Sequence, residues 1–312
     1  MEPRRVPVAV IGAGLMGQGI GQLLAVHGHP VSLMDLKRSL LDKAIEKIRS
    51  NLIWMAQNNI YCLDKINSSI SPIKTTTELK EAVEDAQFVI EAVNEDLELK
   101  QEIFREMDML CPEDVILATN TSAISITEVA GKALNRSRIL GTHFWNPPYL
   151  IPLVEVIKGQ ETNEKAMDRT CEFLKEAGKH PVRVNKDVPG FVGNRLQHAL
   201  WREAISIVEH GIADPATVDE CVKFGFGLRL PALGPLENSD MVGLDLTLAI
   251  HKYLLKHLES SPYSSSLLRE KVDNGELGFK TGRGFYQWTP HQTEESRNNL
   301  ENYLIGLVRG KM

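Results

Sequence analysis

The sequence predicts an α/β fold in which a doubly wound, mostly parallel sheet is followed by an all-helical C-terminal domain. Two patterns carry this prediction. Up to about residue 188, short apolar runs alternate with stretches of helical spacing; beyond it, helical patterns are separated by segments rich in Gly and Pro. Alternating strands and helices are typical of a parallel sheet that helices cover on both faces. We therefore expect two domains, 1–188 and 189–312, with the boundary near residues 187–190.

The predicted strands are compact runs rich in Val, Ile and Leu. They lie at residues 8–11, 31–34, 88–93, 115–118, 139–144 and 153–157. Apolar residues at helical spacing predict helices between the strands, at residues 15–27, 40–58 and 97–110. In the second part, helices are predicted at residues 191–210, 215–224 and 243–258, and one short strand pattern is found at residues 284–288.

Composition and charge exclude several classes of protein. The chain of 312 residues has 35 Lys and Arg residues against 41 Asp and Glu residues, a formal net charge of −6. Because no Lys/Arg-rich run is present, we expect no nucleic-acid partner. No apolar stretch approaches the roughly 18 residues of a membrane span, so no membrane partner is expected either. The start, MEPRR followed by VPVAVIG, lacks the apolar segment of a signal peptide, which favours a cytoplasmic protein.

The four cysteines are far apart in the sequence. Cys62, Cys111, Cys171 and Cys221 form no Cys-x-x-Cys pair, so neither a zinc knuckle nor a thioredoxin-type motif is predicted. We expect unpaired thiols in a reducing compartment and no bound metal.

A glycine-rich motif directly follows the first predicted strand. Gly12-Ala13-Gly14-Leu15-Met16-Gly17 matches the G-x-G-x-x-G pattern of a dinucleotide-binding turn that opens a helix. The N–H groups at a helix N-terminus bind phosphates. Asp35 ends the second strand, 23 residues beyond Gly12, where a carboxylate binds a ribose 2′-hydroxyl and repels a 2′-phosphate. The motif predicts a Rossmann-like domain that binds NAD rather than NADP.

Polar residues at later strand ends are candidates for catalysis, because ligands of open α/β sheets bind at the carboxyl ends of strands. Asn120, Thr121 and Ser122 follow one strand, His143 lies in the next, and Glu155 lies 12 residues beyond His143. A His held by a carboxylate is a suitable general base for oxidation of an alcohol. From spacing alone, His143 as an ordinary core residue and Ser122 as a helix cap remain open alternatives.

The whole chain resembles the L-3-hydroxyacyl-CoA dehydrogenase family. The matching segments keep their order over about 280 residues, from GAGLMG through VIEAVNEDLELK, ATNTSAISIT, GTHFWNPP, LVEVIKG, GKHPV, DVPGFVGNRL and GPLENSDMVGLD to GFKTGRGFY.

The resemblance assigns roles to individual residues. It implies that His143 is the general base, that Glu155 orients it, and that Ser122 and Asn194 hold the substrate. The predicted cofactor contacts come from the resemblance, from the N-terminus of the first helix and from one strand end, and they are Gly12, Gly14, Leu15, Met16, Gly17, Asp35, Glu95, Lys100, Asn120, Asn146 and Lys280. Relatives of this kind are commonly dimers, and apolar helix faces near residues 201–208 and 242–250 suit a homodimer surface.

Three departures from the acyl-CoA pattern bear on the substrate. Positions that contact CoA in the family align with Asn51 and Asn58, which bring no charge to a phosphate. The segment NPPYLIPLVEV resembles the branch of lambda-crystallin, L-gulonate 3-dehydrogenase and carnitine dehydrogenase. Arg229, in the long loop GFGLRLPALGP, suits a free carboxylate. Resemblance also extends to a pyridine-carboxylate dehydrogenase, with KDVPGFV and TPHQT in common.

These departures favour a free 3-hydroxy acid as substrate, such as a sugar acid, a carnitine-like compound or a pyridine carboxylate. A short-chain (S)-3-hydroxyacyl-CoA remains the alternative, because GELGFKTGRGFYQW is closer to the acyl-CoA enzymes. A crystallin-like, non-catalytic NAD-binding protein is an alternative of another class. Dehydrogenases of the 3-hydroxyisobutyrate type share the glycine-rich opening but use a Lys base, and they lack the HFWNPP and LVEV segments.

Overall fold

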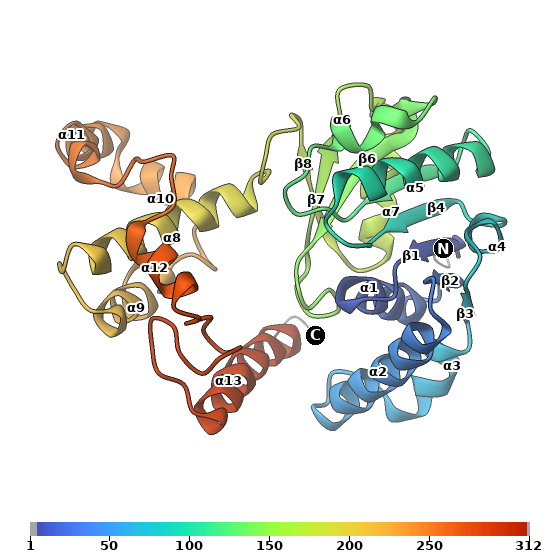
Figure 1. Cartoon of the computed structure of the whole chain (residues 1–312), viewed down its shortest axis with the longest axis horizontal. Helices are drawn as coiled ribbons and strands as arrows, with labels where there is room; N and C mark the ends of the chain where they lie inside the picture. Colours follow the sequence, from blue (N-terminus) through green and yellow to red (C-terminus); the bar gives the residue numbers. More distant parts are fainter. Residues whose placement is uncertain (1–4, 311–312) are drawn as a thin grey trace. The chain divides into compact units, whose positions relative to one another are not determined.

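An eight-stranded sheet is found in one part of the computed structural model, which describes residues 5–310 (Figure 1). Two compact units are present: residues 5–195 with 301–310, and residues 196–300. The first contains the sheet, and the second contains only helices and turns. The strands are β1 (Val8–Ile11), β2 (Val31–Met34), β3 (Ile73–Thr76), β4 (Phe88–Glu91), β5 (Ile116–Thr119), β6 (Ile139–Phe144), β7 (Leu153–Lys158) and β8 (His180–Val184).

The sheet has the order β3-β2-β1-β4-β5-β6-β7-β8 and is parallel from β3 to β6. The predicted doubly wound, mostly parallel sheet is therefore confirmed. β7 runs antiparallel to β6, because the short connection from residue 145 to 152 holds no crossover helix that could return the chain to the starting edge. β8 is parallel to β7. The strands β3 and β8 are absent from the prediction and form the two edges of the sheet.

Helices cover both faces of the sheet, and the alternation of side chains in β1 makes this visible. Val8 and Val10 belong to one apolar cluster, whereas Ala9 and Ile11 belong to the other. Helices α1, α2 and α7 complete the first cluster, and α4, α5 and α6 complete the second. The longer helices of this unit are α1 (Leu15–Val26), α2 (Arg38–Gln57), α5 (Leu97–Leu110) and α7 (Glu164–Glu176), and the shorter ones are α3 (Ile66–Ile70), α4 (Leu79–Val83) and α6 (Ile126–Val129).

The second unit is helical, as predicted. Its helices are the greater part of α8 (Gly193–Glu209), then α9 (Pro215–Phe224), α10 (Pro235–Val242), α11 (Leu244–Leu254), α12 (Ser266–Asp273) and the first half of α13 (Pro290–Arg309). The expected strand at residues 284–288 is not formed. Only isolated bridges, from Arg283 to Gly278 and to Gln287, occur in this glycine-rich turn. The end of α13 belongs to the first unit, where Ile305 is buried beside α2.

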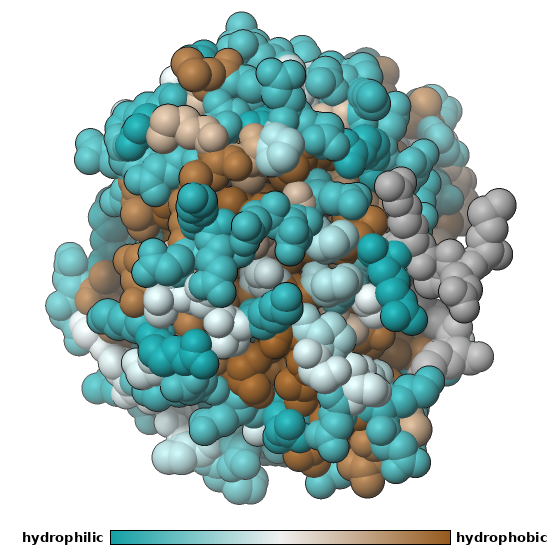
Figure 2. All heavy atoms as spheres, turned by 90° about the vertical axis from the view of Figure 1, so that its right-hand side faces the viewer, coloured by the Kyte–Doolittle hydropathy of each residue, from teal (hydrophilic) through white to brown (hydrophobic). Residues whose placement is uncertain are grey.

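Hydrophilic side chains prevail on the face of the molecule shown in Figure 2, where hydrophobic side chains form separate groups. Within residues 5–310, no helix combines the length and the apolar character that crossing a membrane requires.

Candidate active site

The glycine-rich turn lies between β1 and α1, at the carboxyl ends of the parallel strands. Gly12 has a left-handed φ of +103°, which turns the chain from the strand into the helix. A side chain on Gly17 would lie 1.8 Å from the Gly12 carbonyl oxygen, so only glycine allows α1 to pack on the turn. No side chain of the described residues caps the start of α1 at Leu15. The N–H groups of its first turn are therefore available to an anion.

The residues around this turn fit a dinucleotide. A side-chain carbon on Gly14 would meet nothing within 4 Å, so the space beside the turn is open to a phosphate group. Asp35 follows β2, and its Oδ2 accepts a hydrogen bond from Ala13 N at 3.0 Å, which holds the carboxylate next to the turn. Leu15 is exposed and Met16 half-buried at the start of α1. A carboxylate for ribose hydroxyls beside N–H groups for phosphates is the chemistry that NAD requires.

His143 and Glu155 are direct partners in the antiparallel ladder of β6 and β7. Directly opposed residues in such a ladder carry their side chains on the same face, about 5 Å apart. His143 Nδ1 lies 2.9 Å from Glu155 Oε2. Because a carboxylate only accepts hydrogen bonds, Nδ1 carries the proton and Nε2 carries the lone pair. Nε2 makes no hydrogen bond in the part of the chain that the structure describes, so it is available to take a proton.

Glu155 is buried but remains the anionic partner of this pair. Burial alone would raise the pKa of its carboxyl, yet hydrogen bonds from His143, Gly193 and Val192 outweigh burial and hold the pKa below its ordinary value. Val192 N and Gly193 N both donate to Oε1, at 2.9 and 3.0 Å. A carboxylate that stays charged stabilises the imidazolium formed when His143 takes a proton.

Ser122 and Asn194 meet beside this pair. Asn194, in the first turn of α8, donates through Nδ2 to the Ser122 carbonyl oxygen at 3.0 Å. The turn that carries Ser122 is bound by Glu95, whose Oε1 accepts hydrogen bonds from Thr121 Oγ1 at 2.6 Å, Ser122 N at 2.9 Å and Ala123 N at 3.3 Å. Burial would raise the pKa of Glu95, but these bonds and the charge of Lys100 lower it. Glu95 therefore orders the Ser122 turn.

Lys100 and Glu91 form a buried ion pair behind this turn. Lys100 is 1% exposed, and its Nζ lies 2.7 Å from Glu91 Oε1 and 3.5 Å from Glu95 Oε2. Glu91 also accepts hydrogen bonds from Thr119 Oγ1 and Val93 N. Burial leaves Lys100 in contact with the two carboxylates rather than with solvent, and the predicted contact of Lys100 with the cofactor stays a prediction. The sequence reasoning missed Glu91, although a carboxylate inside an apolar strand signals a buried partner.

The remaining predicted contacts lie in different surroundings. Asn120 Oδ1 accepts a hydrogen bond from Phe144 N at 2.9 Å, which ties the end of β5 to the end of β6. Asn146 is exposed in the connection that follows His143. Arg229 and Lys280 are exposed residues of the second unit. Their proposed contacts with substrate and cofactor stay predictions.

Asn51 and Asn58, the positions that align with CoA contacts, are both occupied by local hydrogen bonds. Asn51 is buried on α2, and its Nδ2 donates to Gln22 Oε1 of α1 at 3.1 Å. Asn58 follows α2, and its Nδ2 donates to the Trp54 carbonyl oxygen at 3.0 Å. Neither amide group adds a positive charge to this surface.

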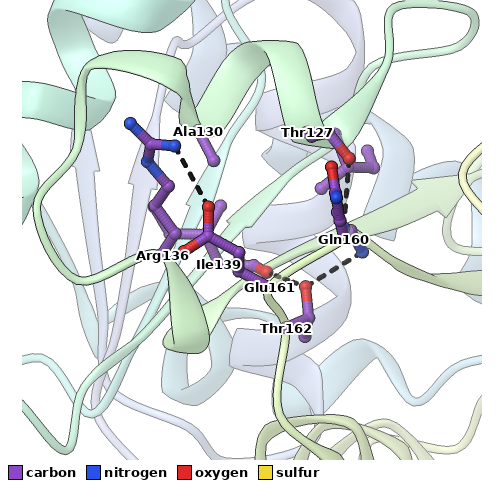
Figure 3. Close-up of a pocket in the computed structure, with 9 residues that line it drawn as sticks. Thr127, Ala130, Arg136, Ile139, Gln160, Glu161 and Thr162 are labelled. Atoms are coloured by element: carbon purple, nitrogen blue, oxygen red, sulfur yellow. Dashed lines mark hydrogen bonds and ion pairs between the residues drawn. The ribbon is translucent and has the colours of Figure 1, made fainter.

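A cavity of about 10 Å³ lies at the other end of β6 and is distinct from this site (Figure 3). Its wall includes Ile139, Thr162, Thr127 and Gln160, and hydrogen bonds join Gln160 N to Thr127 Oγ1 and Thr162 Oγ1 to the Ile139 carbonyl oxygen. This volume suits one water molecule and is far too small for a cofactor or substrate.

Two family models match consecutive parts of the chain. The model of the 3-hydroxyacyl-CoA dehydrogenase NAD binding domain matches residues 7–188, and that of the 3-hydroxyacyl-CoA dehydrogenase C-terminal domain matches residues 190–288. The chain belongs to the 3-hydroxyacyl-CoA dehydrogenase family. Its first unit is therefore the NAD-binding part of a dehydrogenase, and the expectation from resemblance is confirmed at this level.

Relatives within the 3-hydroxyacyl-CoA dehydrogenase family differ in the substrates that their names give. The 5-formyl-3-hydroxy-2-methylpyridine 4-carboxylate 5-dehydrogenase of Mesorhizobium japonicum is 34% identical over 304 residues, 97% of each chain. The 3-hydroxybutyryl-CoA dehydrogenase of Clostridioides difficile is 37% identical over 282 residues, 90% of this chain and 99% of the relative. The crystal structure of a 5-dehydrogenase of the same pyridine carboxylic acid, described as an NAD+-dependent dismutase, has a TM-score of 0.89 at 32% identity and 98% coverage of both chains.

Proposed function

We propose that the protein is an NAD-dependent dehydrogenase that oxidises a secondary hydroxyl group, at the carbon β to a carboxyl or thioester group, to a ketone. His143, Glu155, Ser122 and Asn194 are its catalytic residues. The observation that carries this proposal is the direct opposition of His143 and Glu155 in the β6–β7 ladder, with Nε2 left available. The hydrogen bond from Asn194 Nδ2 to the Ser122 carbonyl oxygen joins the start of α8 to the turn that carries Ser122.

In this mechanism His143 acts as the general base. Its Nε2 takes the proton of the substrate hydroxyl group, while Glu155 accepts from Nδ1 and stabilises the positive charge on the ring. The low pKa of Glu155 keeps this stabilisation present at neutral pH. Ser122 and Asn194 hold the reacting oxygen. Bound NAD would supply the acceptor for the hydride. Cofactor contacts are proposed for Gly12, Gly14, Leu15, Met16, Gly17, Asp35, Glu95, Lys100, Asn120, Asn146 and Lys280.

A free 3-hydroxy acid is the substrate class that we propose. Asn51 is buried and donates a hydrogen bond to Gln22, so α2 has no cation at the position that aligns with a CoA contact. The relative of Mesorhizobium japonicum, matched over 97% of both chains, is named for a pyridine carboxylate with a formyl group at position 5, so it supports the free carboxylate and not the 3-hydroxyl group. Arg229 supplies a guanidinium for such a carboxylate. A short-chain 3-hydroxyacyl-CoA is the second candidate, supported by the relative named for 3-hydroxybutyryl-CoA.

The charged state and geometry of the His143–Glu155 pair argue against a non-catalytic NAD-binding protein. Burying a carboxylate is costly, and a chain without catalytic function gains nothing from a His whose second nitrogen stays unbonded. Two further properties are proposals. Four free cysteines support a reducing, cytoplasmic compartment. The exposed apolar side chains of α8, α10 and α11 support a homodimer formed through the helical unit.

The reaction is tested by following NADH formation with free 3-hydroxy acids and with 3-hydroxyacyl-CoA esters. We expect turnover with at least one class, and His143→Gln and Glu155→Gln should each lower kcat by about two to four orders of magnitude, the range for loss of a positioned base. Leu134→Ala, at a side chain that is 90% exposed, is the control and should keep full activity. Near-full turnover in His143→Gln would remove the general base from the proposal.

The substrate class is tested by Arg229→Ala. A guanidinium that binds a free carboxylate contributes about 1.5 to 3 kcal/mol, so the variant should raise KM for a free acid about 10-fold or more. The KM for a thioester, which has no free carboxylate at that end, should change less than about 3-fold. Equal increases of KM for both classes would exclude the carboxylate contact.

A further inference from the structure

The turn that leads into α8 has an unusual backbone conformation. Phe191 has a φ of +50°, in the left-handed region, and within residues 5–310 only Asn59 is another non-glycine residue with positive φ. Asn adopts this conformation readily, whereas a bulky aromatic residue does so rarely. The surrounding structure must therefore hold Phe191 in place.

Two sets of contacts hold Phe191. Its side chain is 1% exposed and belongs to the apolar cluster on one face of the sheet, and its ring lies 5.8 Å from the ring of His143. On the backbone, Phe191 N donates to the Val188 carbonyl oxygen at 3.0 Å, and Arg195 N donates to the Gly190 carbonyl oxygen at 3.2 Å. The conformation is thus fixed from both sides of the turn.

The left-handed conformation of Phe191 directs two consecutive backbone N–H groups toward one carboxylate oxygen. Val192 N and Gly193 N both donate to Glu155 Oε1, while Oε2 contacts His143. A left-handed residue next to right-handed ones produces such a concave pair of N–H groups, which binds anions. Oε1 of Glu155 is therefore hydrogen-bonded to the backbone, and only Oε2 is directed at His143.

Gly193 allows this approach. A side-chain carbon at this position would lie 2.5 Å from Trp145 Cζ2 and 3.3 Å from Glu155 Oε2. Any larger residue must move either the start of α8 or the carboxylate. Trp145 in turn packs beside the His143 ring, with 5.3 Å between ring centroids.

We propose that residues 191–193 form a carboxylate-binding turn in which Phe191 and Gly193 are positioning residues. They act through Glu155, whose rotation they prevent, and thereby set the direction of His143 Nε2. This proposal rests on the proposed function, since it assigns further residues to the same pair. It also makes the geometry of the base depend on how α8 begins.

A double-mutant cycle tests this proposal. Gly193→Ala is measured in the natural chain and in a Glu155→Ala background, where the turn has no carboxylate left to bind. We expect Gly193→Ala to lower kcat about 10-fold or more in the natural chain and less than about 3-fold in the background, with KM for NAD changed less than 2-fold. The pH profile of kcat/KM should shift in the single variant only, because only there does a carboxylate still act on His143. Equal losses in both backgrounds would overturn the proposal.

Matched control variants distinguish a loss of activity caused by misplacement of Glu155 from one caused by impaired folding. Gly306→Ala, in α13 with open space around it, is the control for the Gly193 substitution and should keep full activity. If Gly193→Ala does not fold, as judged by circular dichroism, Phe191→Leu replaces it in the same cycle. Its control is Phe173→Leu, which also removes a buried ring but lies on α7 and stacks on Phe88.

The outcomes also distinguish this proposal from the proposed function. If Glu155→Ala itself leaves turnover intact, the general-base mechanism fails and the turn has no catalytic role. If Glu155→Ala abolishes most turnover but the two changes act independently, the mechanism stands and the positioning role of residues 191–193 is wrong.

Discussion

Glu91 and Lys100 illustrate, at the scale of single residues, where the sequence was informative and where it was not. His143 and Glu155 are predicted from their places at strand ends and from the resemblance, and a carboxylate inside an apolar strand also requires a partner. The same argument applies to Glu91, but the apolar run 88–93 led us to interpret it only as a strand. Lys100 was assigned from resemblance, and the resemblance does not reveal that its ammonium group is buried against Glu91.

The Glu91–Lys100 pair should make a large contribution to the stability of the first unit. Removing one partner of a buried ion pair typically costs 3 to 5 kcal/mol, because the other charge stays buried without compensation. We expect Lys100→Met to lower the free energy of unfolding by about that amount in urea denaturation at pH 7. The double variant Glu91→Gln, Lys100→Met should recover at least half of the loss.

The control for this experiment is the surface pair of Lys132 and Glu102, whose side chains are about half exposed. Lys132→Met should change the free energy of unfolding by less than about 1 kcal/mol. A Lys100→Met variant as stable as the Lys132→Met variant would contradict the prediction.

At the scale of elements, the sequence predicted the strands of the sheet centre and missed its edges. β1, β2 and β6 are fully or nearly buried, because both faces of the sheet are covered by helices. β3 and β8 are edge strands with the sequences IKTT and HPVRV, whose polar residues obscure the pattern. β7 is antiparallel to β6 because the connection between them is too short for a crossover helix. The periodicity of apolar residues does not indicate strand direction, so it could not predict this feature.

Lys179 binds the connection between β6 and β7 through hydrogen bonds. This buried side chain donates through Nζ to the carbonyl oxygens of Pro148 and Ile151, the latter at 2.7 Å, and no carboxylate of the described residues pairs with it. Burial lowers the pKa of Lys179 from 10.5 to about 8. Two carbonyl acceptors suit a neutral amine, which still has two N–H groups to donate.

Because the pKa of Lys179 is lowered in the folded chain, the free energy of unfolding should rise with pH. Between pH 8 and 10.5 the unfolded chain keeps the Lys179 proton and the folded chain has released it, so a higher pH favours the folded state by up to about 1.4 kcal/mol per pH unit. We expect the free energy of unfolding, relative to that of Lys179→Met, to increase between pH 8 and pH 10 in urea titrations. Lys47→Met, at an exposed side chain, is the reference for unspecific effects of pH. A difference that stays flat or falls with pH would refute this prediction.

At the scale of the whole molecule, the helical second unit exposes many apolar side chains. No residue of α9, α10, α11 or α12 is buried, and α11 exposes Leu244, Leu248 and Tyr253. Exposed apolar surface of this extent is typical of an interface between protein chains. The predicted boundary at residues 188 and 189 stays a prediction, and the end of α13 belongs to the sheet-containing unit.

A homodimer through this surface should be detectable by light scattering after size exclusion, as twice the mass of the chain at micromolar concentration. Leu248→Arg places a charge in the proposed interface, and loss of a central apolar contact costs about 2 kcal/mol or more, so its dissociation constant should rise about 30-fold or more. Leu134→Arg, the same change at an exposed position of the first unit, should leave the dimer intact. A monomer in the natural chain would exclude this interface.

The pairing of β6 and β7 also makes the position of His143 opposite Glu155 independent of the segment that connects the two strands. The register that opposes His143 and Glu155 is maintained by the strands themselves, from Leu140 opposite Lys158 to Phe144 opposite Val154. A graft that lengthens or replaces part of residues 149–152 therefore leaves base and partner facing each other. The proton acceptor therefore tolerates any change of this connection that leaves the two strands paired.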